Sequence, residues 1–513
     1  MTDSATRTRG RRGRDRHIAE RVSSTAGARP AGGASAGDAA RPRVPDLAVL
    51  PGLLARSGEL EALVERFARA RDGRATGLRH VTYAAIPHGA KTFLAAALVR
   101  ASGERLVWVA RDAEIADRVA EELQAWIGDP AAVVTLEPRS SLAYERSELI
   151  RDESAARVAA LAAWRAGDAT QDATIGPAQD AAIGPARVLV TSVQALFQRT
   201  LAPDALPTEP LTIRRGARLS QERVLRSLLE LGYEAVAEVG GRGEFTRRGG
   251  IVDCFPAGQP LPVRIEWFGD EIDSLRAFDP ADQRGVGAVE RTVLLPASEF
   301  LFRAADQGPE GATDWLRARL GRLGSKLSEP LQQDLARLAN GQLSDAAEIW
   351  GGILAPASGL HHLGDAIWLL DEPQDVHDAG DSLRSQAEER RAEMERAGEL
   401  PKGWADAYPT AREWKRALVE ARTLELTWES EADGAPPGGN PFGWHEPVMP
   451  PQAITSLAPT ISRWRREGAR VVLTSDQSAR LSEILAEADI VAAPTAHLVE
   501  APPAGGLALV ERS

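Results

Sequence analysis

Residues 81–101 read VTYAAIPHGAKTFLAAALVRA, and residues 105–110 read RLVWVA. The first stretch predicts a buried strand at 81–85, a loop, and a helix at 92–101, and the second predicts another strand. Further along the chain we expect a helix at 113–126, a strand at 132–136, a helix at 153–164 and a strand at 187–191. Strands that alternate with helices indicate an α/β fold with a parallel sheet and helices on both faces.

The composition restricts the class of protein. The 513 residues predict three or four domains at about 150 residues each. The net charge of −12 argues against wrapping of duplex DNA by charge alone. The single cysteine, Cys254, excludes an internal disulfide, and no apolar run approaches the ~20 residues that span a bilayer. We therefore expect a cytoplasmic protein with no membrane segment.

The domain organisation follows from changes of pattern along the chain. Residues 1–45 carry ten arginines against four acids, a net charge of 10 − 4 = +6, and predict a disordered basic tail. A purely solvated tail and a weak, salt-sensitive nucleic-acid contact both fit this composition. The octads QDATIGPA and QDAAIGPA at 171–186 predict an exposed loop insertion. The predicted parts are an α/β domain at 46–210 and 298–431, a small α+β domain at 211–297, a linker at 432–441 and a small α/β domain at 442–513.

Local signals define elements in the later parts of the chain. In the small α+β domain they predict a helix at 221–231 and strands at 235–239, 243–248, 251–255, 263–268 and 271–278. Gly269 and Asp270 fit a two-residue type II′ turn with glycine first. Thr410 and Glu413 have the spacing of a capping box at the start of a helix. At 442–513 we expect a helix at 457–467, a strand at 470–474 and a helix at 477–487, with no closing element.

The loop after the first strand raises the question of a nucleotide site. In a phosphate-binding loop, GxxxxGK[ST], glycine amides close on phosphate, lysine reaches the phosphate oxygens and Ser/Thr holds Mg²⁺. Lys91 and Thr92 are in register with this motif, and Gly89 lies within the loop. Ala85 and Ala90 occupy the two glycine positions. A Cβ at those positions opposes the close approach of phosphate, and Pro87 removes an amide donor.

A second fragment of a nucleotide site occurs at 367–372, which reads IWLLDE. An apolar strand that ends in Asp371 and Glu372 is typical of a Walker B site, where aspartate holds Mg²⁺. The alternative interpretation of these residues is a buried strand with acidic residues at its exposed end. Together the two fragments predict an NTPase-type core that has lost its site, with no catalytic residue and no metal ligand set.

The strand at 263–268 predicts a recognition surface. Val263, Ile265 and Trp267 alternate onto one face, which we assign to the core, and Arg264, Glu266 and Phe268 alternate onto the other. An outward phenylalanine beside an arginine is typical of an interface centre. Arg248, on the strand at 243–248, is a further candidate for this surface. A Phe268 packed under a neighbouring loop is the alternative.

Two stretches carry a close resemblance to a known family: GEFTRRGGIVDCFP at 243–256 and PVRIEWFGDEIDSLR at 262–276. They resemble the signature shared by the excision-repair protein UvrB and the transcription-repair coupling factors. Residues 53–513 look like the N-terminal portion of a coupling factor.

The resemblance implies a UvrB-like, degenerate RecA-type domain interrupted by the small domain that contacts UvrA. Carried over, the UvrA-contact positions are Arg248, Arg264, Glu266 and Phe268. The stretch at 137–150 holds only Tyr144 as an aromatic residue, so insertion into damaged DNA by stacking is not expected.

The family continues into an RNA-polymerase-binding domain and an ATP-dependent DNA translocase, and we expect neither within these residues. The resemblance therefore implies UvrA as the partner. RNA polymerase, DNA, ATP and Mg²⁺ belong to family regions beyond this chain. A UvrB-like protein that binds ATP and damaged DNA is the alternative function, supported by Lys91 and Thr92 with Asp371 and Glu372.

Overall fold

The computed structural model describes residues 45–512 apart from 73–75, 168–185, 208–209, 302–307, 341, 343–344, 430–438 and 448–453. Three sequence predictions fall almost wholly outside the described residues: the basic tail at 1–45, the tandem octads at 171–186 and most of the linker at 432–441.

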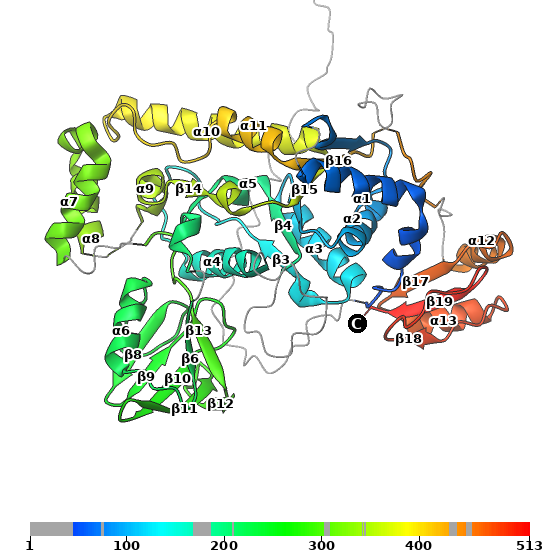
Figure 1. The fold of residues 1–513 in the computed structure, drawn as a ribbon, viewed down its shortest axis with the longest axis horizontal. Helices are drawn as coiled ribbons and strands as arrows, with labels where there is room; N and C mark the ends of the chain where they lie inside the picture. The colour runs from blue at the N-terminus through cyan, green and yellow to red at the C-terminus, as the bar shows by residue number, and fades with distance from the viewer. Residues whose placement is uncertain are drawn as a thin grey trace, which may run out of the picture. The chain divides into compact units, whose positions relative to one another are not determined.

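A sheet of six parallel strands forms the larger domain (Figure 1). In spatial order its strands are β1 (His80–Tyr83), β16 (Arg422–Leu426), β15 (Ile367–Asp371), β2 (Leu106–Ala110), β4 (Val188–Ser192) and β3 (Val133–Leu136). Every neighbouring pair is parallel. Strands β2 and β4 are buried along their whole length, as central strands covered on both faces must be. The predicted α/β class is confirmed.

Helices cover the two faces of this sheet and divide the interior into two cores. Leu106 and Trp108 of β2 belong to one core, while Val107 and Val109 belong to the other, because successive side chains on a strand point to opposite faces. The first core is closed by α1 (Gly58–Arg71), α2 (His88–Ser102) and α3 (Ala113–Ile127). The second is closed by α4 (Arg151–Ala166), α5 (Val193–Phe197), α9 (Ala347–Leu354), α10 (Pro373–Ala397) and α11 (Ala411–Glu420).

Two separate segments of the chain build this sheet. Strands β15 and β16 follow the small domain in sequence, yet they lie between β1 and β2 in space. The α/β domain is thus interrupted by the small domain, as the sequence predicts. The capping box at the start of α11 is also confirmed, since Thr410 Oγ1 accepts from the Glu413 amide at 3.2 Å and Glu413 Oε2 accepts from the Thr410 amide at 2.7 Å.

The small domain is built on antiparallel hairpins. Its main sheet has the order β12 (Gly285–Ala288), β11 (Glu271–Phe278), β10 (Val263–Phe268), β9 (Ile251–Cys254), β8 (Glu244–Arg248) and β7 (Glu234–Ala235). Helix α6 (Gln221–Glu230) closes one face of this sheet through Val224 and Leu228. Strands β6 (Leu211–Arg214) and β13 (Arg291–Leu294) pair with each other where the chain enters and leaves the domain.

The remaining elements connect these parts. Strands β5 (Arg199–Thr200) and β14 (Ala357–Ser358) form a short antiparallel pair. Helices α7 (Gly308–Leu320) and α8 (Glu329–Ala339) precede α9. A three-stranded parallel sheet follows near the end of the chain, in the order β17 (Val471–Ser475), β19 (Leu507–Glu511) and β18 (Pro494–Thr495), with α12 (Ile454–Arg466) and α13 (Ser478–Ala486).

Two sequence predictions about these elements are wrong. The strand predicted at 235–239 extends only over β7, because Val239 leaves the sheet and packs with Phe255 and Phe278 in a separate apolar cluster. The sequence predicts no closing element at 442–513, but β19 lies at the centre of the sheet in this segment and pairs with both β17 and β18.

A buried ionic network holds the chain where it returns from the small domain. Glu299 is fully buried, and its carboxylate pairs with Arg139 and with Arg157, whose Nε lies 2.8 Å from Oε1. Arg139 also donates to Glu348 at 2.7 Å. Burial alone would raise the pKa of Glu299, but the two guanidinium groups outweigh burial and the pKa is lowered. The backbone amide of Glu299 donates to Ser154 Oγ at 2.9 Å, so both backbone and side chain are fixed.

We predict that Glu299→Ala destabilises the larger domain by about 3 kcal/mol, since it leaves two buried guanidinium groups short of a counter-charge. Urea unfolding followed by tryptophan fluorescence measures this change. Glu388→Ala, which removes an exposed carboxylate from α10, is the control and leaves the unfolding midpoint in place. Equal midpoints for the two variants would contradict the structural role of the network.

Candidate functional site

The loop between β1 and α2 contains the positions that match the phosphate-binding motif. Ala85 has a positive φ of 56°. Glycine adopts this left-handed conformation without steric cost, whereas alanine is strained in it. The backbone at the first glycine position of the motif is therefore left-handed, and it carries a methyl group.

The amides that start this loop are already engaged within the protein. The Ala85 N–H donates to the carbonyl of Glu429 at 2.9 Å, and the Ile86 N–H donates to the carbonyl of Thr427 at 3.0 Å. A phosphate cradle requires several successive amides that point at one anion. These two amides instead donate to carbonyls of the segment that directly follows β16.

The second half of the loop also uses backbone donors within the protein. Helix α2 begins at His88, and the amides of Ala90 and Lys91 donate to the Pro87 carbonyl at 2.8 and 3.2 Å. A Cβ added at Gly89 would meet nothing within 4 Å, so this glycine is not required for the approach of any neighbouring atom of the protein. The loop thus turns directly into a helix, and four of its amides, those of Ala85, Ile86, Ala90 and Lys91, donate to carbonyls of the protein.

The Lys91 side chain is buried and paired with two carboxylates. Its Nζ lies 2.7 Å from Asp371 Oδ1 and 2.5 Å from Glu372 Oε1, and only 1% of the side chain is exposed. Glu372 also accepts hydrogen bonds from the Trp428 amide and the Thr427 hydroxyl. Burial alone would raise the pKa of Glu372, but Lys91 and these two donors outweigh it and lower the pKa. In an active nucleotide site this lysine would contact phosphate. Here it neutralises the two carboxylates instead.

The Thr92 hydroxyl is also committed to protein groups. It donates to Glu122 Oε2 at 2.8 Å and accepts from Trp126 Nε1 at 3.1 Å. Burial is the largest cause of a raised pKa at Glu122. In a phosphate-binding loop this hydroxyl holds Mg²⁺, and here it links α2 to α3.

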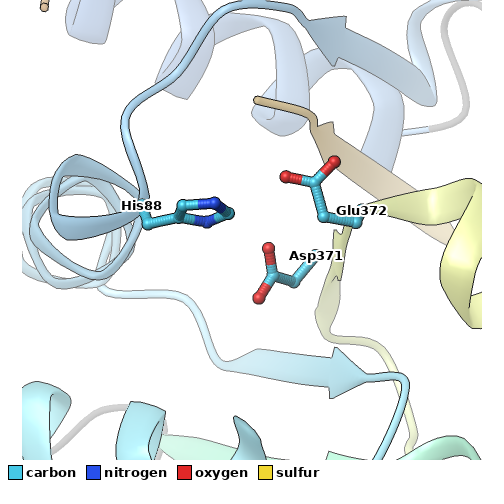
Figure 2. A group of neighbouring side chains, drawn as sticks. All are labelled: His88, Asp371 and Glu372. Carbon is cyan, nitrogen blue, oxygen red and sulfur yellow. The ribbon is translucent and has the colours of Figure 1, made fainter. Parts of the chain in front are cut away.

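His88, Asp371 and Glu372 are grouped closely enough to be considered as metal ligands (Figure 2). One ligand atom from each lies within 4.8 Å of the others. The Lys91 ammonium already contacts both carboxylates and supplies the positive charge that a cation would bring. The His88 ring stacks on Trp428 at 5.5 Å between centroids. A divalent ion would compete with a built-in cation here, which disfavours a metal centre.

The segment at 439–447 covers the same loop. Asn440 Nδ2 donates to the Ala85 carbonyl at 3.0 Å, and the Ala84 amide donates to the carbonyl of Gly439 at 3.0 Å. The Phe442 ring packs edge-on against Tyr83, with centroids 5.8 Å apart. The sequence did not predict these contacts, because they join positions more than 350 residues apart.

The second predicted site lies on the small domain and contains an exposed aromatic ring. Phe268 is 82% exposed, while Val263 and Ile265 on the same strand are buried. Trp267 is half-buried, and its Nε1 donates to the Leu219 carbonyl at 2.7 Å. The structure thus places Phe268 on the face opposite the core, and it is not packed under a neighbouring loop.

The turn beside this ring has the predicted type. Gly269 has a positive φ of 64°, and Asp270 is absent from the positive-φ residues of the described chain. A positive φ at the first central residue alone is the pattern of a type II′ turn. Glycine is required at this position to bring β11 back beside β10 with Phe268 held at the tip.

Strand register brings Arg248 and Glu266 onto the face of Phe268. Arg248 pairs with Ile251, which in turn pairs with Glu266, and directly opposed residues project to the same face. Glu266 accepts from Ser274 Oγ at 2.7 Å. The Arg248 side chain is exposed.

Arg264 shares this face but is bound within the domain. Its Nε and Nη2 donate to the two carboxylate oxygens of Asp253 at 2.7 and 2.9 Å. These hydrogen bonds are the main reason that the pKa of Arg264 is raised. Asp253 is 1% exposed, and the guanidinium lies 4.9 Å from the centroid of the Phe278 ring. Arg264 is therefore partly structural, a role that the sequence does not predict because the pair depends on the register between β9 and β10.

The comparisons with known proteins agree with this fold. Residues 211–300 match the UvrB interaction domain family. The small domain is therefore similar to UvrB interaction domains.

Beyond this domain, the chain is similar to curated transcription-repair-coupling factors. It is 36% identical to that of Mycobacterium tuberculosis over 263 residues, which cover 51% of this chain and 20% of the relative. It is 28% identical to that of Myxococcus xanthus over 414 residues, which cover 75% of this chain and 33% of the relative.

The UvrABC system protein B of Fervidobacterium nodosum is 29% identical over 159 residues, which cover 31% of this chain and 24% of that protein. The resemblance to the N-terminal portion of a coupling factor is thereby confirmed, and the chain spans a fifth to a third of the length of the coupling factors compared here. Among the described residues, no helix has the length and apolar character needed to cross a bilayer.

We predict a pH-dependent loss of stability in Lys91→Met. The lowered pKa of Glu372 means that its ion pair stabilises the fold above the unfolded-state pKa and is lost as pH falls through the folded-state pKa. The variant should be about 3 kcal/mol less stable at pH 7.5. Its deficit should shrink at about pH 4.5, near the ordinary pKa of a glutamate, because the Glu372 carboxylate that has lost its lysine then takes up a proton. Thermal unfolding of the wild type and of Lys91→Met at the two pH values measures the deficit in stability. A deficit that does not depend on pH would contradict a stabilising ion pair between Lys91 and Glu372.

We also predict that Arg264→Ala and Phe268→Ala differ in stability. The first leaves the buried Asp253 carboxylate without its partner and destabilises the small domain by about 3 kcal/mol. The second truncates an exposed ring and changes stability by less than about 0.5 kcal/mol. Thermal unfolding of each variant measures the difference. A stable Arg264→Ala variant would show that the pair with Asp253 does not support the domain.

Proposed function

We propose that this chain is the UvrA-recruiting part of a transcription-repair coupling factor. The observation that carries the proposal is the exposed Phe268 ring on the face that also presents Arg248 and Glu266. The match of 211–300 to the UvrB interaction domain supports it independently of this geometry. In this role the chain links transcription stalled at damage to nucleotide excision repair by bringing UvrA to the site.

The physical basis is a rigid aromatic anchor among charged groups. A phenylalanine loses little conformational freedom on binding and buries a large apolar area, so it suits the centre of an interface. Phe268 sits beside a turn fixed by Gly269, and Ser274 orients Glu266. Because the face is preorganised in the free protein, little of the binding energy is spent on ordering it.

The larger domain acts as a scaffold in this proposal and does not hydrolyse ATP. The amides of Ala85 and Ile86 are engaged, and Lys91 is neutralised by Asp371 and Glu372. ATP, Mg²⁺, DNA and RNA polymerase are partners of other regions of the family. The setting we infer for the chain is the cytoplasm, where these partners act.

We predict that Phe268→Ala and Arg248→Glu each weaken UvrA binding. Loss of an interface anchor costs about 2 kcal/mol or more, about thirty-fold in Kd. Biolayer interferometry with immobilised chain and purified UvrA at fixed salt measures the change.

The matched control is Arg247→Glu. Arg247 neighbours Arg248 on β8 and is exposed, but it pairs with the core residue Val252 and so projects from the other face. Its charge change is identical, so its Kd should stay within about two-fold of wild type. Unchanged affinity in both Phe268→Ala and Arg248→Glu would reject the proposal.

A further inference from the structure

A third segment contributes to the face around Phe268. Residue Phe268 pairs with Glu271 across the hairpin, and Glu271 forms an isolated antiparallel bridge with Arg218 on its other side. Residues that oppose each other directly in antiparallel pairing project to the same face. Arg218, Glu271 and Phe268 therefore form one row on the outer face of the sheet, although Arg218 lies in the connection between β6 and α6.

This connection is fixed to the hairpin by its backbone. The amide of Gly216 donates to the Ile272 carbonyl at 2.8 Å, and the Ile272 amide donates to the Ala217 carbonyl at 3.0 Å. The Leu219 amide donates to the Asp270 carbonyl at 2.9 Å. Hydrogen bonds on both sides of Arg218 hold its Cα in register with Glu271. The backbone from which the Arg218 side chain projects is therefore fixed.

The charge of Arg218 is available to a partner. Its side chain is exposed, and within the described part of the chain it forms no ion pair, even with the neighbouring Glu271. Arg248 stands two strands from β10 on one side, and Arg218 stands two strands from β10 on the other. With strands about 4.8 Å apart, the two guanidinium groups originate about 10 Å to either side of the Phe268 strand.

We propose that Arg218 is a further contact residue of this face and that the partner presents an apolar pocket with acidic groups on both sides of it. The inference rests on the proposed function, because it concerns the same partner, UvrA. It adds a charge contact from a segment outside the two hairpins that carry the resemblance. Flanking arginines specify how the partner is oriented about the phenylalanine, whereas the ring alone would permit rotation.

The test compares two charge reversals of equal size. Arg218→Glu places a carboxylate against the acidic group of the partner and should weaken UvrA binding by more than about ten-fold. Arg223→Glu is the control, because Arg223 is exposed on α6, the helix that covers the opposite face of the sheet. It should bind UvrA within about two-fold of wild type. Binding is measured at two salt concentrations, with circular dichroism to confirm that each variant is folded.

The outcomes separate this inference from the function on which it rests. If Phe268→Ala weakens binding and Arg218→Glu matches Arg223→Glu, the face ends at Glu271 and the role of Arg218 is rejected, while the proposed function stands. If Phe268→Ala, Arg248→Glu and Arg218→Glu all bind as wild type, both proposals fail. Weaker binding of Arg218→Glu, with a reduced dependence of Kd on salt, supports the inference.

Discussion

The insertion of β15 and β16 between β1 and β2 is the constraint on which the rest of this structure depends. Parallel pairing requires these two late strands to return to the centre of a sheet whose other strands precede the small domain. The chain therefore leaves the larger domain, forms the small domain, and then returns to complete the sheet of the larger domain. The ionic network of Glu299 with Arg139 and Arg157 lies at the point of re-entry and fixes it.

The same pairing determines the state of the nucleotide loop. Because β15 ends two strands from β1, its terminal Asp371 and Glu372 reach Lys91. In an active site these groups would be bridged by Mg²⁺ and phosphate. Here they neutralise one another directly, and the carbonyls of Thr427, Glu429 and Gly439 accept hydrogen bonds from the amides of residues 84–86. The parallel sheet brings these charged groups together, and their ion pairs stabilise the fold.

Local patterns predicted much of this arrangement. Thr410 and Glu413 identified a helix start because a capping box involves neighbours only, and the alternation over 263–268 placed Phe268 outside because side-chain direction follows strand period. The pair of Arg264 with Asp253 could not be predicted, since it depends on the register between two strands. The cover formed by Asn440 and the central place of β19 also depend on contacts between distant positions.

We infer that this chain presents a protein-binding face on the small domain and a closed nucleotide loop on the larger domain. Hydrogen–deuterium exchange on the same protein, with UvrA and separately with ATP and Mg²⁺, tests both halves at once. We expect UvrA to slow exchange in peptides covering 263–276 and 216–219, and ATP to leave exchange in peptides covering 84–92 unchanged. Protection of 84–92 by ATP, with no effect of UvrA on 263–276, would contradict it.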